Sequence, residues 1–348
     1  MLLVATNKAD LASDYFILRL KERGIPFVRL NTEDYGTRFQ IHIAVGATAD
    51  FVIRCDNGES FASDAISAVY FRQPRTPHIS SEIAPSDRAF AARELKEVLR
   101  GLWRVIPARL WLNHPRNLWL ASNKIEQLHL ARDFGLCVPE TCITNSRASV
   151  REFYDRHEGQ IICKAVKNGF SHADNIVTMA TTKRVEADFI EQFDEYAMLP
   201  MIYQREIIKN CDVRVTIVGD KIYATAIYSQ EHADTEVDWR VWDVSDLDLR
   251  HEPITLPADI AEGCRKITAH FGLRYAAIDL VLGQDGRWYF LELNPNGQWA
   301  WIEKKAGYPI RDAIIECLQG RKDVYGWDSR ANSFEGSQRP SAIAGLRP

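Results

Sequence analysis

The residues best placed to do chemistry are two carboxylates in an apolar stretch near the C-terminus. Residues 276–296 read AAIDLVLGQDGRWYFLELNPN, in which two apolar runs flank an Asp-Gly pair. Asp-Gly between apolar runs is a strong signal for a β-hairpin. A two-residue loop at 285–286, or a four-residue loop at 284–287, places Asp279 directly opposite Glu292, with Cβ atoms roughly 4.5–5.5 Å apart. A three-residue loop would break this pairing.

Asn294 adds a third oxygen ligand, because it lies two residues after Glu292 and therefore shares its face of the strand. Two facing carboxylates in an apolar hairpin repel each other unless a cation lies between them. Asp, Glu and Asn offer only oxygen ligands, which Mg²⁺ prefers together with substrate phosphates. We therefore expect a magnesium site at Asp279, Glu292 and Asn294. The alternative interpretation is a pair of solvated carboxylates on an open sheet face.

Two lysines are candidates for contact with phosphate. Lys164 lies inside the apolar run 160–166, QIICKAV, and a charge in such surroundings needs an anionic partner. The residues that follow, 168–171, are suited to a loop that closes over phosphates. Lys124 lies in the first turn of a helix expected at 122–134, where backbone N–H groups already favour anions. Taken alone, either lysine is more often structural or solvated.

A third segment alternates polar and apolar residues. In the run 212–218, DVRVTIV, the side chains of Asp212, Arg214 and Thr216 share one face of the expected strand. We interpret this face as a cleft wall on which Arg214 holds a carboxylate or a developing acyl phosphate through its fork of donors. A face that is simply solvent-exposed is the alternative. The preceding run 203–208 joins two units, and we expect its main chain to hydrogen-bond a purine.

The elements that carry these residues predict an α/β (α+β) protein of several units. Strands at 2–5 and 27–30 around a helix at 14–23 make a βαβ opening. Further strands are expected at 65–71, 160–166, 175–179, 201–208, 213–218, 221–228, 276–282 and 288–293, with a helix at 258–271. The expected domains are 1–112, 113–198 and 199–327. The polar tail at 328–348, rich in Gly, Ser and Pro, is expected to be disordered.

Composition excludes several classes of protein. The 348 residues are 46% hydrophobic and 26% charged, as in an ordinary globular enzyme that folds without disulfides or a structural metal. A net charge of −4 argues against a nucleic-acid binder that relies on broad phosphate neutralisation. Seven cysteines without a C-x-x-C pair are typical of reduced thiols. Without a signal peptide or an apolar run of ~18 residues, we expect a cytoplasmic protein with no membrane partner.

Taken in chain order, these elements resemble the ATP-grasp fold preceded by a pre-ATP-grasp domain, from about residue 2 to 325. The resemblance rests on Asn123, Lys124, Lys164, the segment 204–207, Asp212, Arg214, Asp279 and the segment 292–297. Within this class the chain looks most like the maturases that make microviridins and related graspetides from ribosomal peptides. That closer likeness rests on the segments VYFRQP (69–74), NHP (113–115), NKIEQL (123–128), VPET (138–141), DWR (238–240) and NPNGQW (294–299). The chain departs from the family at 204–207, where Gln-Glu-Tyr-Val is usual, and at Gln73, where the family often has Arg.

The resemblance implies an ATP-grasp fold with an N-terminal pre-ATP-grasp α/β domain, a central small domain and a C-terminal antiparallel-sheet domain. It also implies ATP and Mg²⁺ as cofactors. Phosphates would be held by Lys124 and Lys164, adenine by Gln204, Arg205, Glu206 and Ile207, and ribose by Asp212. Magnesium would be held by Asp279, Glu292 and Asn294. Catalytic roles fall to Arg214 and Arg240.

The expected reaction activates a side-chain Asp or Glu carboxylate of a precursor peptide, composed of leader and core, as an acyl phosphate. A Ser or Thr hydroxyl or a Lys amine of the same peptide then attacks, which gives an ω-ester or ω-amide macrocycle. Catalysis would come mostly from positioning and charge neutralisation. Two alternatives stay open: an amino-acid ligase of the glutamate-ligase or glutathione-synthetase type, and a non-catalytic nucleotide-binding regulator. A homodimer is compatible with the sequence.

Overall fold

The described part of the chain comprises most residues up to 320. A computed structural model describes residues 1–46, 50–167, 170–173, 176–179, 181–192, 199–241 and 248–320. The expected tail at 328–348 and residues 168–169 of the expected phosphate loop lie outside these ranges. Within the ranges, no helix is long and apolar enough to cross a membrane.

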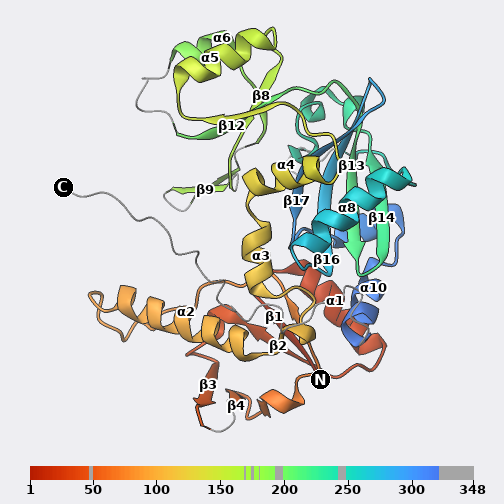
Figure 1. The fold of residues 1–348 in the computed structure, drawn as a ribbon. Coiled ribbons are helices and arrows are strands. Elements are labelled where there is room, and N and C mark those ends of the chain that lie inside the picture. The colour runs from red at the N-terminus through yellow and green to blue at the C-terminus, as the bar shows by residue number, and fades with distance from the viewer. Residues whose placement is uncertain are drawn as a thin grey trace, which may run out of the picture.

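The N-terminal unit is built on a parallel sheet with a helix on each face (Figure 1). The strand order is β2-β1-β6, and β1 pairs in parallel with both neighbours. The expected βαβ opening is therefore confirmed. The elements are β1 (Leu2–Thr6), α1 (Leu11–Glu22), β2 (Phe27–Asn31), β6 (Ala68–Phe71) and α2 (Arg88–Val105).

A second, antiparallel sheet packs beside this unit and was not expected from the sequence. It has the order β3-β4-β5, with β3 (Phe39–Ala44), β4 (Asp50–Cys55) and β5 (Ser60–Ala62). Phe39, Ile53 and Phe61 from these strands enter the same apolar core as Leu102 and Trp103 of α2. β3 and β4 have six residues each, and apolar and polar residues alternate along β3 (FQIHIA), so the sequence does carry a period-two signal for this sheet.

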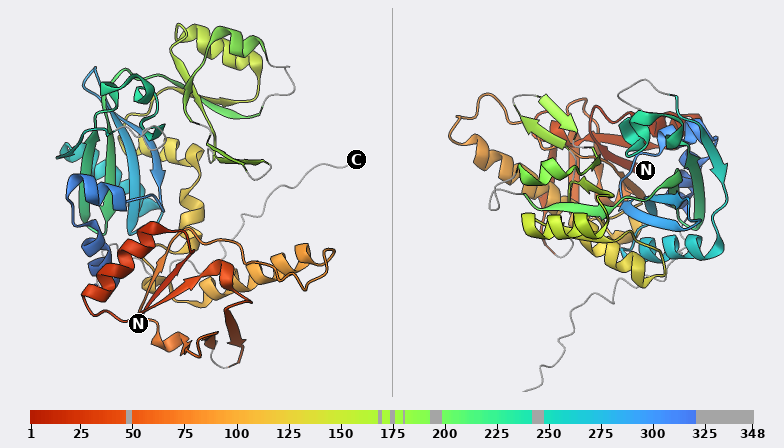
Figure 2. Two further views of the ribbon diagram at one scale, coloured as in Figure 1. Left: turned by 180° about the vertical axis from the view of Figure 1, so that it is seen from behind. Right: turned by 90° about the horizontal axis from the view of Figure 1, so that it is seen from above.

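Two helices lead from this unit to a small central unit, which stands at the opposite end of the molecule (Figure 2, left). They are α3 (Pro115–Ala121) and α4 (Lys124–Asp133). The central sheet is antiparallel in the order β11-β8-β12-β7, with the hairpin β9–β10 beside it. Its elements are β7 (Thr141–Thr144), α5 (Arg147–Arg156), β8 (Ile161–Lys164), β9 (Phe170–Ala173), β10 (Ile176–Met179), β11 (Lys183–Arg184), α6 (Ala187–Glu191) and β12 (Met201–Arg205).

The C-terminal unit is a five-stranded antiparallel sheet in the order β15-β14-β13-β16-β17. One face packs on α8 and α4 around Val213, Val215 and Ile217. The other face meets α9, α10 and the N-terminal unit. The elements are β13 (Lys209–Val218), β14 (Lys221–Ile227), β15 (His251–Ile254), α8 (Ala258–His270), β16 (Tyr275–Gly283), β17 (Trp288–Asn294), α9 (Ala300–Ala306) and α10 (Ile310–Gln319).

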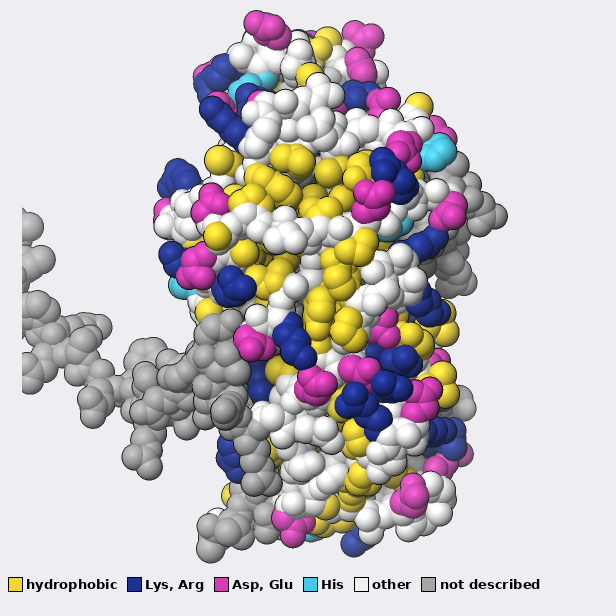
Figure 3. Space-filling view, turned by 90° about the vertical axis from the view of Figure 1, so that its right-hand side faces the viewer, with side chains coloured by type: hydrophobic (Ala, Val, Ile, Leu, Met, Phe, Trp, Pro, Cys, Tyr) yellow, Lys and Arg dark blue, Asp and Glu magenta, His cyan; other side chains and the backbone are white. Residues whose placement is uncertain are grey.

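The surface on the side of β14, α8 and α10 mixes charges of both signs. Figure 3 shows this side, with apolar side chains across its centre and Lys or Arg side chains interspersed with Asp and Glu. The visible face carries no extended field of one sign. This matches the small net charge of −4.

Candidate active site

The predicted opposition of Asp279 and Glu292 is confirmed, although the predicted hairpin loop is wrong. Asp279 pairs directly with Glu292 across β16 and β17. The loop has three residues, 284–286, because Gly283 N–H donates to Arg287 O at 2.9 Å. Gly286 at φ +77° supplies the left-handed conformation that such a loop needs. A bulge between Phe290 and Glu292 then shifts the register by one residue and restores the pairing.

Each of these carboxylates has its own cationic partner. Asp279 Oδ1 accepts from Arg214 NH1 at 2.7 Å, and Glu292 Oε2 lies 2.8 Å from Lys124 Nζ. Burial raises the pKa of Asp279 and the Arg214 guanidinium opposes that rise. Burial also disfavours ionisation of Glu292, but Lys124, Lys164 and Arg240 outweigh it and lower the pKa of Glu292 to about 2. Glu292 is therefore ionised at neutral pH and lies within a cluster of cations.

Asn294 completes a set of oxygen-bearing side chains that fits Mg²⁺. Its Nδ2 donates to Asp279 Oδ2 at 3.3 Å and to Glu292 Oε1 at 3.1 Å, so the amide lies between the two carboxylates. Rotation of the amide would present its oxygen to the same place. Among the described residues no three or more His, Cys, Asp or Glu side chains gather as a metal cage. A site of two carboxylates and one amide suits Mg²⁺ that also takes phosphate oxygens.

Lys164 lies at the end of β8 and faces the same cluster from the central unit. Its Nζ donates to Gln204 Oε1 at 3.0 Å, while Gln204 Nε2 donates to Thr141 Oγ1 at 2.8 Å. Burial, helped by the neighbouring charges of Lys124 and Arg240 and opposed by Glu292, lowers the pKa of Lys164 to about 8. Gln204 is thus a buried residue that orients Lys164.

Lys124 is the first residue of α4, and the capping of that helix changes one expectation. The Asn123 side chain accepts from the N–H groups of Ile125 and Glu126 at 3.0 and 3.1 Å. These two donors are therefore not free for an anion. The Lys124 ammonium lies beside Glu292 and donates to Ala165 O at 3.4 Å. This ammonium, rather than the start of the helix, is the group that we expect to bind phosphate.

The segment 204–207 presents little free main chain. Arg205 N–H donates to Glu140 O and Glu206 N–H to Gln160 O, each at 2.9 Å. The Glu206 carboxylate is held by Arg184 at 2.9 and 3.0 Å. Ile207 N–H has no backbone acceptor among the described residues. Adenine recognition by this segment stays a prediction, and Ile207 is its best-placed donor.

The polar face of β13 is buried and not solvent-exposed. Asp212, Arg214 and Thr216 are 4, 5 and 0% exposed. Asp212 Oδ2 accepts from Lys209 Nζ at 2.8 Å and from Ser229 Oγ at 2.5 Å, and its pKa is raised by burial against the effect of Lys209. Asp212 thus belongs to a cluster of its own, and its ribose role stays a prediction.

Arg240 joins the site from the loop after β14. Its Nε and NH2 donate to the two oxygens of Asp238 at 2.8 and 2.7 Å, and its NH1 lies 3.9 Å from Glu292 Oε1. The hydrogen bonds to Asp238, together with the negative charges of Asp238 and Glu292, raise the pKa of Arg240 despite its burial. The structure therefore brings together five predicted residues around Glu292: Lys124, Lys164, Asp279, Asn294 and Arg240, with Arg214 behind Asp279.

Three supporting residues were not given a role from the sequence. Gln127 of α4 accepts from Leu293 N–H and donates to Leu293 O, each at 2.8 Å, next to Glu292. Arg72 donates to Gly297 O at 2.9 Å and pairs with Asp10 at 3.2 Å, at 1% exposure. A Cβ on Gly297 would lie 2.8 Å from Arg214 NH2. Their segments, NKIEQL, VYFRQP and NPNGQW, were singled out, but contacts between distant segments carry no local signal.

Two family models cover nearly all of the described chain. Residues 1–118 match the MvdD pre-ATP-grasp domain, and residues 121–318 match the RimK-like ATP-grasp domain. No curated protein sequence matches the chain.

Solved structures with similar folds include two macrocyclases and a RiPP-associated ATP-grasp ligase. The macrocyclase MdnC from Microcystis aeruginosa, bound with precursor peptide MdnA, has 25% identity and a TM-score of 0.79, covering 92% of this chain and 99% of that one. The macrocyclase MdnB from the same organism has 26% identity and a TM-score of 0.74, covering 91% and 98%. An ATP-grasp ligase from Chryseobacterium gregarium, in complex with ADP and a leader and core peptide, has 24% identity and a TM-score of 0.84, covering 91% and 96%.

Proposed function

The chain belongs to the RimK-like ATP-grasp family, and on that premise we propose that it is an ADP-forming macrocyclase of a ribosomal precursor peptide. It would join side-chain carboxylates of the peptide to its hydroxyl or amine groups. The pre-ATP-grasp match over residues 1–118 and the precursor peptides bound to similar enzymes support a peptide substrate over a free amino acid.

One observation carries the proposal. The Asn294 amide lies between Asp279 and Glu292, within 3.3 Å of both carboxylates, while Lys124 and Arg240 flank Glu292. With Lys164 and Arg214, four cations lie around Asp279, Glu292 and the Asp238 that pairs with Arg240, which leaves one net positive charge. This excess of positive charge suits a polyphosphate, and the paired oxygens suit the hard cation that accompanies it.

Each residue then has a defined task. Lys124 and Lys164 would bind phosphate oxygens, and Asp279, Glu292 and Asn294 would hold Mg²⁺, which would neutralise negative charge on the phosphates. Arg214 would bind the carboxylate of the peptide and the acyl phosphate that develops from it. Its NH1 and NH2 donate to Asp279 and to Gln298 O, and its buried Nε has no hydrogen-bond partner among the described residues.

The chemistry has two steps. First, a side-chain carboxylate oxygen of the peptide bonds to the γ-phosphorus while the bond to the ADP oxygen breaks, so that an acyl phosphate forms and ADP leaves. Second, a hydroxyl or amine of the same peptide attacks the acyl carbon, loses its proton, and displaces inorganic phosphate. The protein contributes positioning and fixed positive charge, and both act on the charge that spreads over the transferred group.

Intact-mass spectrometry of a precursor peptide that carries Asp or Glu together with Ser, Thr or Lys side chains tests the proposal. With Mg²⁺ and ATP, each bond formed should remove one water from the peptide and release one ADP. A ligase of free amino acids would instead add residue masses when amino acids are supplied. A nucleotide-binding regulator would leave the peptide mass unchanged and release no substrate-dependent ADP.

A further inference from the structure

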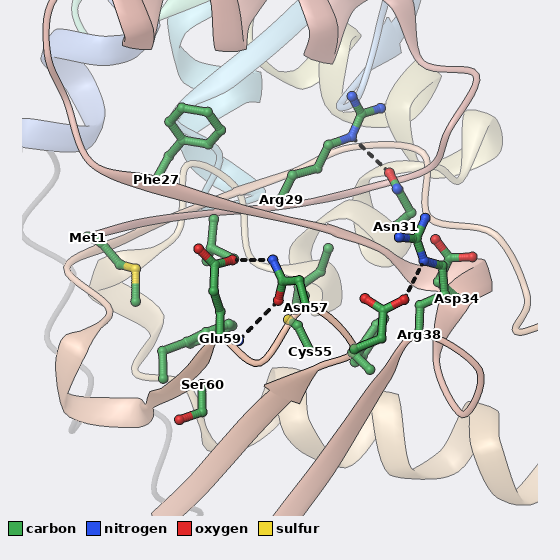
Figure 4. A pocket seen from close by; sticks show the side chains of 15 residues that line it. Met1, Phe27, Arg29, Asn31, Asp34, Arg38, Cys55, Asn57, Glu59 and Ser60 are labelled. Carbon is green, nitrogen blue, oxygen red and sulfur yellow. Dashed lines mark hydrogen bonds and ion pairs between the residues drawn. The ribbon is translucent and has the colours of Figure 1, made fainter.

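A cavity of about 540 Å³ lies in the N-terminal unit, and none of the predicted site residues lines it (Figure 4). Polar side chains around it are paired with one another: Arg38 Nε donates to Asp56 at 2.9 Å, and Asn57 Nδ2 donates to Glu59 at 2.8 Å. These groups therefore have protein partners already. The contacts that bear on the proposed reaction lie elsewhere, along the outer edge of β17.

β17 is an edge strand that carries two of the predicted metal ligands. It is the last strand in the order β15-β14-β13-β16-β17, and Glu292 and Asn294 lie on it to either side of Leu293. The outer edge of such a strand presents N–H and C=O groups that the sheet itself does not pair. Leu293 is 2% exposed and belongs to the apolar core that includes Leu128 of α4. Its outward main-chain groups are therefore shielded from water and need protein partners.

Gln127 of α4 supplies both partners of Leu293. Leu293 N–H donates to Gln127 Oε1, and Gln127 Nε2 donates to Leu293 O, each at 2.8 Å. The side-chain amide thus pairs with the strand as the main chain of a further strand would. Gln127 is 1% exposed, and its Nε2 also donates to Ala121 O, at the end of α3, at 2.5 Å. Gln127 is therefore itself held in place and fixes the main chain of Leu293 relative to α3 and α4.

A second contact holds the same edge on the other side of the bulge. Phe290 N–H donates to Cys137 O at 2.8 Å. The bulge between Phe290 and Glu292 thus lies between two outer contacts, one to Cys137 and one to Gln127. A slip of one residue would turn Glu292 to the opposite face of the sheet, and both contacts oppose such a slip. Of these two contacts, the one from Gln127 is made by a side chain and can be removed by substitution.

The same helix brings a phosphate candidate to the metal ligands. Lys124 lies one turn before Gln127 on α4, and its Nζ lies 2.8 Å from Glu292 Oε2. α4 therefore meets β17 at two successive residues, at Glu292 through charge and at Leu293 through the amide. Figure 1 shows α4 next to β17. The Gln127 contact thus fixes the register between the helix that carries Lys124 and the strand that carries the carboxylate.

We propose that Gln127 is a positioning residue of the metal site. By binding the main chain of Leu293, it keeps the side chains of Glu292 and Asn294 in the arrangement that Mg²⁺ needs. Mg²⁺ demands near-octahedral geometry with short bonds, so a small displacement of one ligand weakens its binding. The inference rests on the metal assignment within the proposed function.

Gln127→Met tests the proposal, because methionine keeps the length and the apolar stem of the side chain but cannot make the two hydrogen bonds to Leu293. Calorimetric titration with ATP, once with excess Mg²⁺ and once with EDTA, gives the factor by which the metal strengthens binding. In the variant this factor should fall to about a tenth of its value in the unmodified enzyme, as is typical when a group that supports metal ligands is lost. The measurement needs neither peptide nor turnover. An unchanged factor overturns the proposal.

Asn117→Leu is the matched control. Asn117 lies on the neighbouring helix α3, and its side-chain amide also binds the main chain of another segment, donating to Gly272 O at 2.9 Å. Loss of this contact should lower the melting temperature and leave the effect of Mg²⁺ on ATP binding unchanged. An equal fall of the factor in both variants would mean that general loosening of the fold causes it, and the positioning role would be wrong.

Amide hydrogen exchange on the unmodified enzyme decides the matter if Gln127→Met does not fold. The N–H of Leu293 should be protected like that of Phe290, since each donates to a group outside the sheet. Fast exchange at Leu293 would show that the Gln127 contact is not maintained, and would refute the proposal.

The titrations also separate this inference from the proposed function. If Mg²⁺ does not strengthen ATP binding to the unmodified enzyme, the metal assignment fails and the proposed function fails with it. If Mg²⁺ strengthens binding equally in the unmodified enzyme and in Gln127→Met, only the positioning role is lost.

Discussion

Asp279 faces Glu292 across β16 and β17 because a one-residue bulge at Leu291 compensates for a three-residue hairpin loop. Without the bulge, Leu291 would take the place opposite Asp279, and Glu292 would turn to the other face of the sheet, where Phe290 packs in the core. The bulge therefore directs the second carboxylate to the side of Lys124 and Arg240.

Glu292→Gln should abolish ADP formation and lower stability. The variant leaves Lys124, Lys164 and Arg240 facing one another without their shared anion, and breaking a buried pair typically costs about 3–5 kcal/mol. Calorimetry should show a lower melting temperature, and Mg-ATP should no longer raise it. Glu262→Gln, at a loose and exposed pair with Arg265 on α8, is the control and should change neither property. Full activity of the Glu292 variant would refute the metal assignment.

The metal hairpin could be predicted because its signal is local. An Asp-Gly turn between apolar runs defines the register of a hairpin to within one residue. The alternation of side chains along each strand then indicates which residues share a face. The prediction that Asp279 lies opposite Glu292 was correct although the predicted loop length was wrong. No feature of the sequence indicates the bulge at Leu291 that compensates for the three-residue loop.

The contacts that hold the site were not predictable in the same way. Gln127 and Leu293 lie 166 residues apart in the chain, and Arg72 and Gly297 lie 225 apart. Such pairs depend on how the units pack, which periodicity does not reveal. The antiparallel sheet β3-β4-β5 is a different case, because the alternation of apolar and polar residues along β3 is a local signal from which this strand could have been predicted.

ATP affinity should fall as the pH rises through about 8, the pKa of Lys164 in the free enzyme. Below this pH the ammonium is charged and attracts phosphate, and above it the charge is lost. Linkage predicts a dissociation constant about tenfold weaker at pH 9 than at pH 7 when ATP keeps the lysine protonated. Lys164→Arg, which stays charged, should bind ATP with a flat profile. Calorimetric titration at both pH values measures the effect, and an equal pH dependence in the arginine variant would assign it elsewhere.

Gly297→Ala should impair the acyl side of the reaction more than nucleotide binding. The new Cβ would lie 2.5 Å from Ala277 Cβ and 2.8 Å from Arg214 NH2, so the guanidinium must shift. We expect kcat to drop at least tenfold, about 1.4 kcal/mol, with the ATP dissociation constant nearly unchanged. Gly101→Ala in α2 is the matched control, since its Cβ meets nothing within 4 Å and should leave kcat unchanged. Unchanged water loss by the Gly297 variant would show that Arg214 tolerates displacement.

Arg72→Lys should uncouple the N-terminal unit from the loop that follows β17. Arg72 pairs with Asp10 and donates to both Asn296 O and Gly297 O, and an ammonium lacks the planar fork that makes these contacts together. A peptide-dependent loss of kcat, with ADP affinity retained, is expected from steady-state kinetics and nucleotide titration. If ADP affinity and kcat fall together, Arg72 acts on the whole fold rather than on the loop.

We propose that a peptide carboxylate is activated as an acyl phosphate at the Asp279–Glu292 site. The most direct measurement uses the precursor peptide with its Asp and Glu side-chain carboxylates labelled with ¹⁸O, followed by mass analysis of the released inorganic phosphate. We expect one ¹⁸O atom in each phosphate released per bond formed, because the carboxylate oxygen that takes the phosphoryl group leaves with it. Unlabelled phosphate, together with water loss from the peptide, would contradict activation as an acyl phosphate.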